Sequence, residues 1–247
     1  MTSLCAPCTQ VRWLLTTLHE LYLLPWDDSV YLDSPLSDFG LEQCKELRAF
    51  LRKPCHDPLT QEDFNALTNG ESHSLVVSSQ LRRAASTTAI ALSDRFQRSK
   101  ESIVLVSHLQ EISRNFDTLA LAPFSSTPPM EPTLDFLAPS ATFDGSANLG
   151  NKTFSFTGLK RLQAFADWAA DRPESTIIVG GHSLWFRNFF ALYLPKSSTH
   201  VAKKKKIINC GVVGFTLQVG RDRQTGLPKY LINESSIASV YGGFATK

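Results

Sequence analysis

The sequence predicts an α/β protein: a three-layer sandwich in which helices cover both faces of a mostly parallel central sheet. Short, continuous apolar runs rich in β-branched residues are typical of strands that are covered on both faces, and the chain has three, at 75–77, 103–106 and 177–179. Helical patterns separate them, at about 80–97 and 157–172. Alternation of strands and helices predicts parallel strands joined by right-handed crossovers.

The length of the chain, 247 residues with 43% hydrophobic content, suits one large domain. We expect residues 33–247 to form that domain and residues 1–32 to form an N-terminal helical segment that precedes it. Residues 123–150 are rich in Pro, Ser, Thr and Ala. This stretch is either a linker between domains or a long loop, and the strand pattern that resumes after it favours the loop.

Three helices are expected before the first strand. Residues 10–24 carry apolar side chains at helical spacing, and residues 37–52 are amphipathic, with Ser37 as a candidate N-cap and Pro54 just beyond the end. A third, short helix begins at Thr60. At the other end of the chain, residues 211–219 and 230–233 predict two strands joined by the polar turn RDRQTGLP, as in a hairpin.

The charge of the chain argues against some classes of partner. A net charge of +2 is too small to indicate nucleic acid or a membrane surface as the main partner. The basic run Lys203 to Lys206 is either a solvated turn or a site for an anionic ligand. No apolar run approaches the ~20 residues of a membrane span, and MTSLCAPCTQ lacks the pattern of a signal peptide. Five scattered cysteines are typical of a reduced, cytoplasmic protein.

Chemistry-bearing side chains follow all three apolar strands. In open α/β sheets, ligands bind beyond the carboxyl ends of the strands. The first strand is followed by Arg82 and Arg83, the second by Glu111 and the third by His182 and Ser183. An arginine fork and a histidine at a helix N-terminus suit a phosphate anion, and a carboxyl group can protonate a leaving oxygen. Consecutive helical residues point about 100° apart, so we expect one arginine of the pair to face the site.

Four segments of the chain, in order from about Asp33 to the C-terminus, resemble motifs of the histidine phosphatase superfamily, which has the phosphoglycerate mutase-like fold. They are similar to D-x-P-L-[ST]-x-x-G-x-x-Q, S-S-x-L-x-R-A-x-x-T, L-x-E and a strand-end G-H-S. The matching residues are 33–43 (DSPLSDFGLEQ), 78–88 (SSQLRRAASTT), 109–111 (LQE) and 181–183 (GHS).

The resemblance implies a phosphomonoester hydrolase or a phosphoglycerate mutase-like protein acting on a phosphorylated small molecule or a phosphoprotein. It makes Arg83 a phosphate-binding arginine, Glu111 the proton donor and His182 a histidine that hydrogen-bonds the transferred phosphoryl group. Ser183 would mainly cap the following helix and border the substrate. Such chemistry needs no metal or cofactor, because arginines and histidines neutralise the phosphate. We expect the loop 123–150 and the lysine run to set selectivity.

One family motif is missing. The family's nucleophile, which forms a phosphohistidine, is the histidine of an Arg-His-Gly motif at the end of the first strand, and this chain contains no Arg-His-Gly. Before Asp33 the sequence has His19 alone, inside a helical pattern, which indicates a helix-surface residue. Two interpretations stay open. The first strand and its histidine would lie upstream of Met1, or the protein is a catalytically inactive phosphate-binding or scaffold protein.

A remote alternative is an α/β-hydrolase with Ser183 as nucleophile. The sequence GHSLW nearly fits the nucleophile elbow G-x-S-x-G, between a strand and a helix. Trp185 stands where that motif has its last glycine. After Ser183 the sequence has one histidine, His200, and the acids that could orient it come later in the chain, the reverse of the order in that fold.

Overall fold

The computed structural model describes residues 6–23, 28–70, 73–152 and 158–246. Its centre is a sheet of four parallel strands in the order β3-β2-β1-β4, with helices on both faces. The predicted α/β sandwich is therefore confirmed, with the three predicted strands in place and one strand that the sequence did not indicate. The strands are β1 (Ser74–Ser78), β2 (Ser102–Leu105), β3 (Thr142–Asp144) and β4 (Thr176–Gly180).

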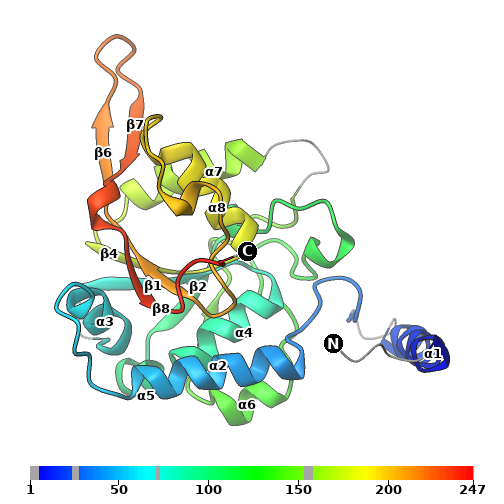
Figure 1. Cartoon of the computed structure of the whole chain (residues 1–247). Coiled ribbons are helices and arrows are strands. Elements are labelled where there is room, and N and C mark those ends of the chain that lie inside the picture. Colours follow the sequence, from blue (N-terminus) through cyan, green and yellow to red (C-terminus); the bar gives the residue numbers. More distant parts are fainter. Residues whose placement is uncertain (1–5, 24–27, 71–72, 153–157, 247) are drawn as a thin grey trace.

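One face of the sheet is covered by a layer of five helices, seen below the strands in Figure 1. Alternate strand residues, Val76, Ile103 and Leu105 among them, point into this layer and form a core with apolar side chains of the helices. The layer contains α2 (Asp38–Leu51), α3 (Gln61–Thr68), α4 (Arg82–Ala91), α5 (Ser93–Ser99) and α6 (Thr133–Leu137).

The opposite face is covered by α7 (Gly158–Ala170) and α8 (Ser183–Tyr193), seen above the strands in Figure 1. The strand residues that alternate with those above, such as Val77, point to this face and pack against a cluster of aromatic side chains. Trp185 of α8 is 1% exposed and stacks on Phe189 at 5.0 Å between ring centroids. Continuous apolar strands are needed because both faces of the sheet are covered.

The helix expected over residues 80–97 is two helices, because the chain turns at Leu92 (φ −100°, ψ 14°) between α4 and α5. Ser93 and Asp94, which follow the turn, are residue types that favour a new helix N-terminus. Asp94 also binds Arg48 of α2 and Arg52, the C-cap residue of α2, at 2.6 and 2.5 Å, so the start of α5 is fixed to the end of α2.

The segment expected to be a loop over residues 123–150 contains α6 and the edge strand β3. β3 has three residues and pairs with β2 in register, Ile103 opposite Phe143. A strand this short shows no alternation of apolar residues, so the sequence could not reveal it. Asn148 holds the two ends of this segment together. It is fully buried and donates from Nδ2 to the carbonyl oxygens of Pro123 and Ser126.

The C-terminal strands form two antiparallel pairs that do not join the central sheet. The strand expected over residues 211–219 is interrupted, and its second half forms the predicted hairpin with the next strand, which projects from the body (Figure 1). The pairs are β5 (Val212–Gly214) with β8 (Ala238–Tyr241), and β6 (Leu217–Arg221) with β7 (Pro228–Ile232). The described residues also form four 3₁₀ turns: η2 (Ser107–Leu109), η3 (Phe116–Thr118), η4 (Val201–Lys203) and η5 (Glu234–Ser236).

Strand β4 lies at an edge of the central sheet, and among the described strands β1 alone pairs with it. Its sequence, TIIVG, is as apolar as that of a central strand, yet all five residues are only partly buried.

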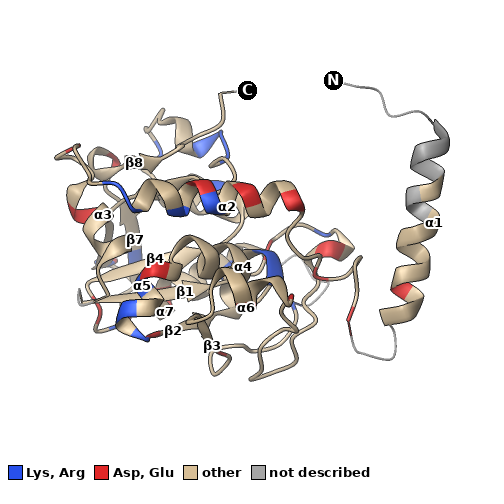
Figure 2. Cartoon of the chain, turned by 90° about the horizontal axis from the view of Figure 1, so that it is seen from below, with Lys and Arg blue, Asp and Glu red and all other residues tan. Residues whose placement is uncertain are grey.

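The N-terminal helix α1 (Ala6–Leu23) stands apart from the rest of the chain in both views (Figures 1 and 2). It contains most of the helix expected over residues 10–24. Glu20 ties it to the segment before α2, because its carboxylate accepts hydrogen bonds from Ser29 Oγ (2.6 Å) and Val30 N–H (2.8 Å). None of the helices in the described ranges is both long and apolar enough to cross a membrane.

Candidate phosphate site

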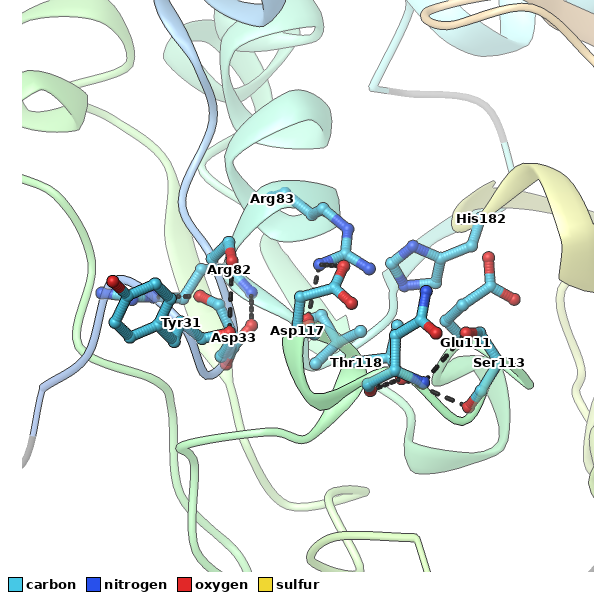
Figure 3. A network of polar contacts seen from close by, with 12 residues as sticks. Tyr31, Asp33, Arg82, Arg83, Glu111, Ser113, Asp117, Thr118 and His182 are labelled. Carbon is cyan, nitrogen blue, oxygen red and sulfur yellow. Dashed lines mark hydrogen bonds and ion pairs between the residues drawn. The ribbon is translucent and has the colours of Figure 1, made fainter. Parts of the chain in front are cut away.

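The two consecutive arginines at the start of α4 point in different directions, as their helical spacing predicts. Arg83 faces the carboxyl edge of the sheet, where its Nη1 donates to Asp117 O at 2.7 Å and lies 3.5 Å from Asp117 Oδ2. Figure 3 shows its guanidinium group beside the His182 ring, with Glu111 beyond that ring. Arg83 is the arginine that the family resemblance makes a phosphate-binding residue, and the structure places it at this edge.

The side chain of Arg82 instead makes structural contacts within the fold. It is 3% exposed and donates from Nε to Asp33 O at 2.7 Å, from Nη1 to Asp28 Oδ1 at 2.5 Å and from Nη2 to Ser29 O. Asp33 has a left-handed backbone (φ 48°), is fully buried and accepts from the N–H groups of Arg82 and Leu121. Burial raises the pKa of the Asp33 carboxyl to about 6, although these N–H groups and both arginines oppose the rise.

Glu111 lies at the same edge, after the 3₁₀ turn η2 that follows β2. Its side chain is buried, and Oε1 accepts from Ile112 N–H at 2.8 Å. Burial raises the pKa of the carboxyl group, against the opposing effects of the N–H groups of Ile112 and Leu184 and of the nearby Arg83 and Lys152 cations. A carboxyl with a raised pKa keeps its proton to a higher pH, as a general acid requires.

His182 is the N-cap residue of α8 and is 6% exposed. Its Nε2 lies 2.9 Å from Ser79 Oγ, at the end of β1. Burial, assisted by the cations Arg83, Lys152 and Arg161, lowers the pKa of His182 well below its usual value. The ring is therefore neutral near pH 7, and it can donate to an anion through one nitrogen while Ser79 holds the other.

Ser183 is not the helix cap that the resemblance implied. It is the first residue of α8, His182 occupies the N-cap position, and no side-chain hydrogen bond caps the helix there. The histidine that an α/β-hydrolase would need, His200, caps η4 through Nδ1, which accepts from Ala202 N–H at 3.2 Å. Its ring is committed to that turn.

Three residues near the site were not indicated by the sequence. Ser79 holds His182, and Lys152 and Arg161 supply cations that lower the pKa of the same ring. Arg161 Nε and Nη1 are buried without a hydrogen-bond partner, and its Nη2 lies 3.5 Å from Glu111 O. Lys152 lies 41 residues from Glu111, across the long segment that contains β3. A cluster of cations around one carboxyl group suits an anionic ligand. The described residues contain no group of three or more His, Cys, Asp or Glu arranged to hold a metal ion.

Two other predictions concern residues away from this edge. His19 is exposed on α1, 6.5 Å from Tyr22 between ring centroids, and α1 stands apart from the site, as expected of a helix-surface residue. Lys203 donates from Nζ to Pro195 O at 2.9 Å, just past the end of α8, where a cation is favourable. The first lysine of the basic run thus has a structural contact.

A hollow of about 440 Å³ lies at the opposite edge of the sheet, near the amino ends of β1 and β4. Its lining includes His73, Glu62 and Thr176 and no arginine or lysine. It therefore lacks the chemistry of an anion site, and the cluster at the carboxyl edge remains the candidate.

Comparison with known proteins adds little to this picture. No protein-family model and no curated protein matches the chain. Three solved chains match it. One, described as "Mycobacterial hydrolase 1", has 17% identity over 87% of this chain and 89% of its own, with a TM-score of 0.42. A similarity of this size assigns no function, so the proposals below are based on the geometry of the site.

Proposed function

We propose that this chain binds the phosphoryl group of a phosphorylated substrate between Arg83, Glu111 and His182, as a protein of the histidine phosphatase type. The observation that supports it best is the meeting of these three side chains at the carboxyl edge, from the ends of three neighbouring strands. The four matching sequence motifs support the same assignment.

The chemistry of each group fits a role. The free face of the Arg83 guanidinium group and a ring nitrogen of His182 would hold the non-bridging phosphoryl oxygens. Glu111, whose pKa is raised by burial, would give its proton to the leaving oxygen as the bond from phosphorus to that oxygen breaks. The resulting alcohol leaves neutral, and the phosphoryl group passes to a nucleophile.

That nucleophile has to lie at the same edge of the sheet. His108 follows β2 at the same edge, and burial lowers the pKa of its ring. It is the first residue to test if the chain turns over a substrate. If the chain does not, the site binds a phosphorylated ligand without hydrolysing it.

Binding and activity measurements on the purified chain distinguish hydrolysis of a phosphorylated substrate from binding without hydrolysis. Calorimetry with tungstate, a phosphate analogue, should show binding that His182→Ala weakens more than tenfold and that Ser183→Ala changes less than twofold. Lys160→Met, an exposed lysine on α7, is the matched control. p-Nitrophenyl phosphate should be tested in parallel, with His108→Gln as a second variant. Absence of tungstate binding by the wild-type chain would contradict the proposed site. Activity that is lost in Ser183→Ala and kept in His182→Ala would favour the α/β-hydrolase interpretation.

A further inference from the structure

The side chain of Lys152 is placed in an unusual way for a lysine. Its Nζ lies 2.8 Å from Glu111 O, 2.7 Å from Ser113 O and 2.6 Å from Thr118 Oγ1, so each of its three protons has an acceptor. Lysine ammonium groups are strongly hydrated and are seldom withdrawn from water without a specific partner. The contacts that replace water here all belong to the turn between Glu111 and Thr118.

The same turn is also held by Gln110, which is fully buried. Gln110 Nε2 donates to Thr118 O at 2.9 Å and to Asn151 Oδ1 at 2.7 Å, and its Oε1 accepts from Lys152 N–H at 2.9 Å. The segment that ends at Lys152 therefore interlocks with the turn through both its backbone and its ammonium group.

The turn carries two groups of the candidate site. Glu111 lies at its start, and Asp117, which contacts Arg83 through both its carbonyl and its carboxylate, lies near its end. Figure 3 shows the hydrogen bonds around Ser113 and Thr118 directly below the row formed by Arg83, His182 and Glu111. A shift of the turn would move both groups at once.

We propose that Lys152 is a positioning residue of the phosphate site: its ammonium group holds the turn from Glu111 to Thr118 so that Glu111 and Asp117 face Arg83 and His182. This inference depends on the function proposed above. Lys152 does not itself bind the phosphoryl group, because its three protons are already donated within the protein.

The charges that face Lys152 make this contact dependent on pH. They are Arg161 of α7, Arg83 of α4, and Glu111 and Asp117 of the turn itself. Burial, followed by the repulsion of Arg161, lowers the pKa of Lys152 to about 8, although Glu111 opposes the change. Above that pH the amine keeps two protons for three acceptors, and one contact with the turn is lost.

The test uses the full chain and tungstate, which is a dianion throughout the pH range of interest. We expect Lys152→Met to raise the Kd for tungstate at least tenfold at pH 7, Lys152→Arg to restore most of the affinity, and Lys160→Met to change nothing. The wild-type Kd should rise severalfold between pH 7 and pH 9. The pKa of the His182 ring, followed by NMR, should rise in Lys152→Met because a nearby cation is removed, and it should return towards the wild-type value in Lys152→Arg, which restores the charge.

Tungstate binding by Lys152→Met as tight as that of the wild type would overturn the inference and leave the proposed function intact. If that variant does not fold, a wild-type Kd that stays flat from pH 7 to pH 9 would overturn it equally. Failure of the wild-type chain to bind tungstate at any pH would instead refute the proposed function.

Discussion

Arg82 and Asp33 are joined by two hydrogen bonds, from the Arg82 N–H to Asp33 Oδ1 at 2.8 Å and from Arg82 Nε to Asp33 O at 2.7 Å. The segment before α2 is thereby fixed to the start of α4, where the next residue, Arg83, enters the candidate site. Of the two adjacent arginines, Arg82 therefore holds the fold together and Arg83 lines the candidate site.

Arg82→Met should destabilise the protein without specifically affecting the site. The substitution removes the ion-pair partner of Asp28 and leaves the carbonyl groups of Asp33 and Ser29 without this donor, and each buried acceptor left unsatisfied typically costs about 1–3 kcal/mol. Urea denaturation measures this cost. A loss below about 1 kcal/mol would contradict the structural role given to Arg82.

Arg83→Met should have the opposite effect. Its guanidinium group is partly exposed and contacts Asp117 at the surface, so we expect little loss of stability. Its removal should cost about 1.5–3 kcal/mol of anion binding, roughly a 10- to 150-fold increase in the Kd for tungstate. Calorimetry on Arg83→Met and on Arg82→Lys, side by side, separates the two roles. Equal losses of affinity in both variants would count against the division.

Asp33 should make stability depend on pH between about 4 and 6. Its pKa is about 6 in the folded protein and 3.8 in the reference state, so the folded chain binds more protons in this interval. The stabilisation is present below pH 4 and is lost as the pH rises through 6, by up to about 3 kcal/mol. Denaturation curves of the wild type and Asp33→Asn at several pH values measure the effect, because asparagine tolerates the left-handed backbone and does not titrate. The asparagine variant should gain relative stability as the pH rises, and parallel curves would exclude this role for Asp33.

Gly180→Ala should destabilise the end of β4. A Cβ atom there would lie 1.9 Å from Thr88 Oγ1, whose hydroxyl donates to Ala84 O inside α4. Overpacking of this kind typically costs about 1–3 kcal/mol. Thr88→Ala in the same chain should recover most of the loss, and a double-mutant cycle by thermal denaturation measures the coupling. Gly220→Ala is the control, because the nearest atom to a Cβ there is Lys229 O at 3.9 Å. Purely additive effects would show that Thr88 is not the obstacle.

Much of the fold could be predicted because three strands of the central sheet contain continuous apolar runs. β1, β2 and β4 are covered on both faces, and this requirement leaves a continuous pattern in the sequence. β3 could not be found, since its three residues at the sheet edge carry no such pattern. The break between α4 and α5 was also hidden, because the apolar face continues through Leu92, which is 5% exposed.

Of the candidate site, only the residues that follow a predicted strand could be predicted from the sequence. Arg83, Glu111 and His182 each follow a predicted strand, and parallel strands bring such residues to one edge. Lys152 follows no predicted strand, and its contact with the turn after β2 depends on the path of the segment that contains β3. Ser79 was overlooked although it lies beside the arginine pair, because a small hydroxyl residue gives no sign of which side chain it will contact.

The open edge of β4 also bears on how the protein behaves in concentrated solution. Edge strands offer a row of backbone donors and acceptors to any extended chain that approaches, and natural proteins commonly protect them with charges or proline. The β4 sequence, TIIVG, contains neither. In the described chain, β4 is therefore a strand at which we expect an extended segment of another molecule to pair, beside the edge of the sheet that holds His182.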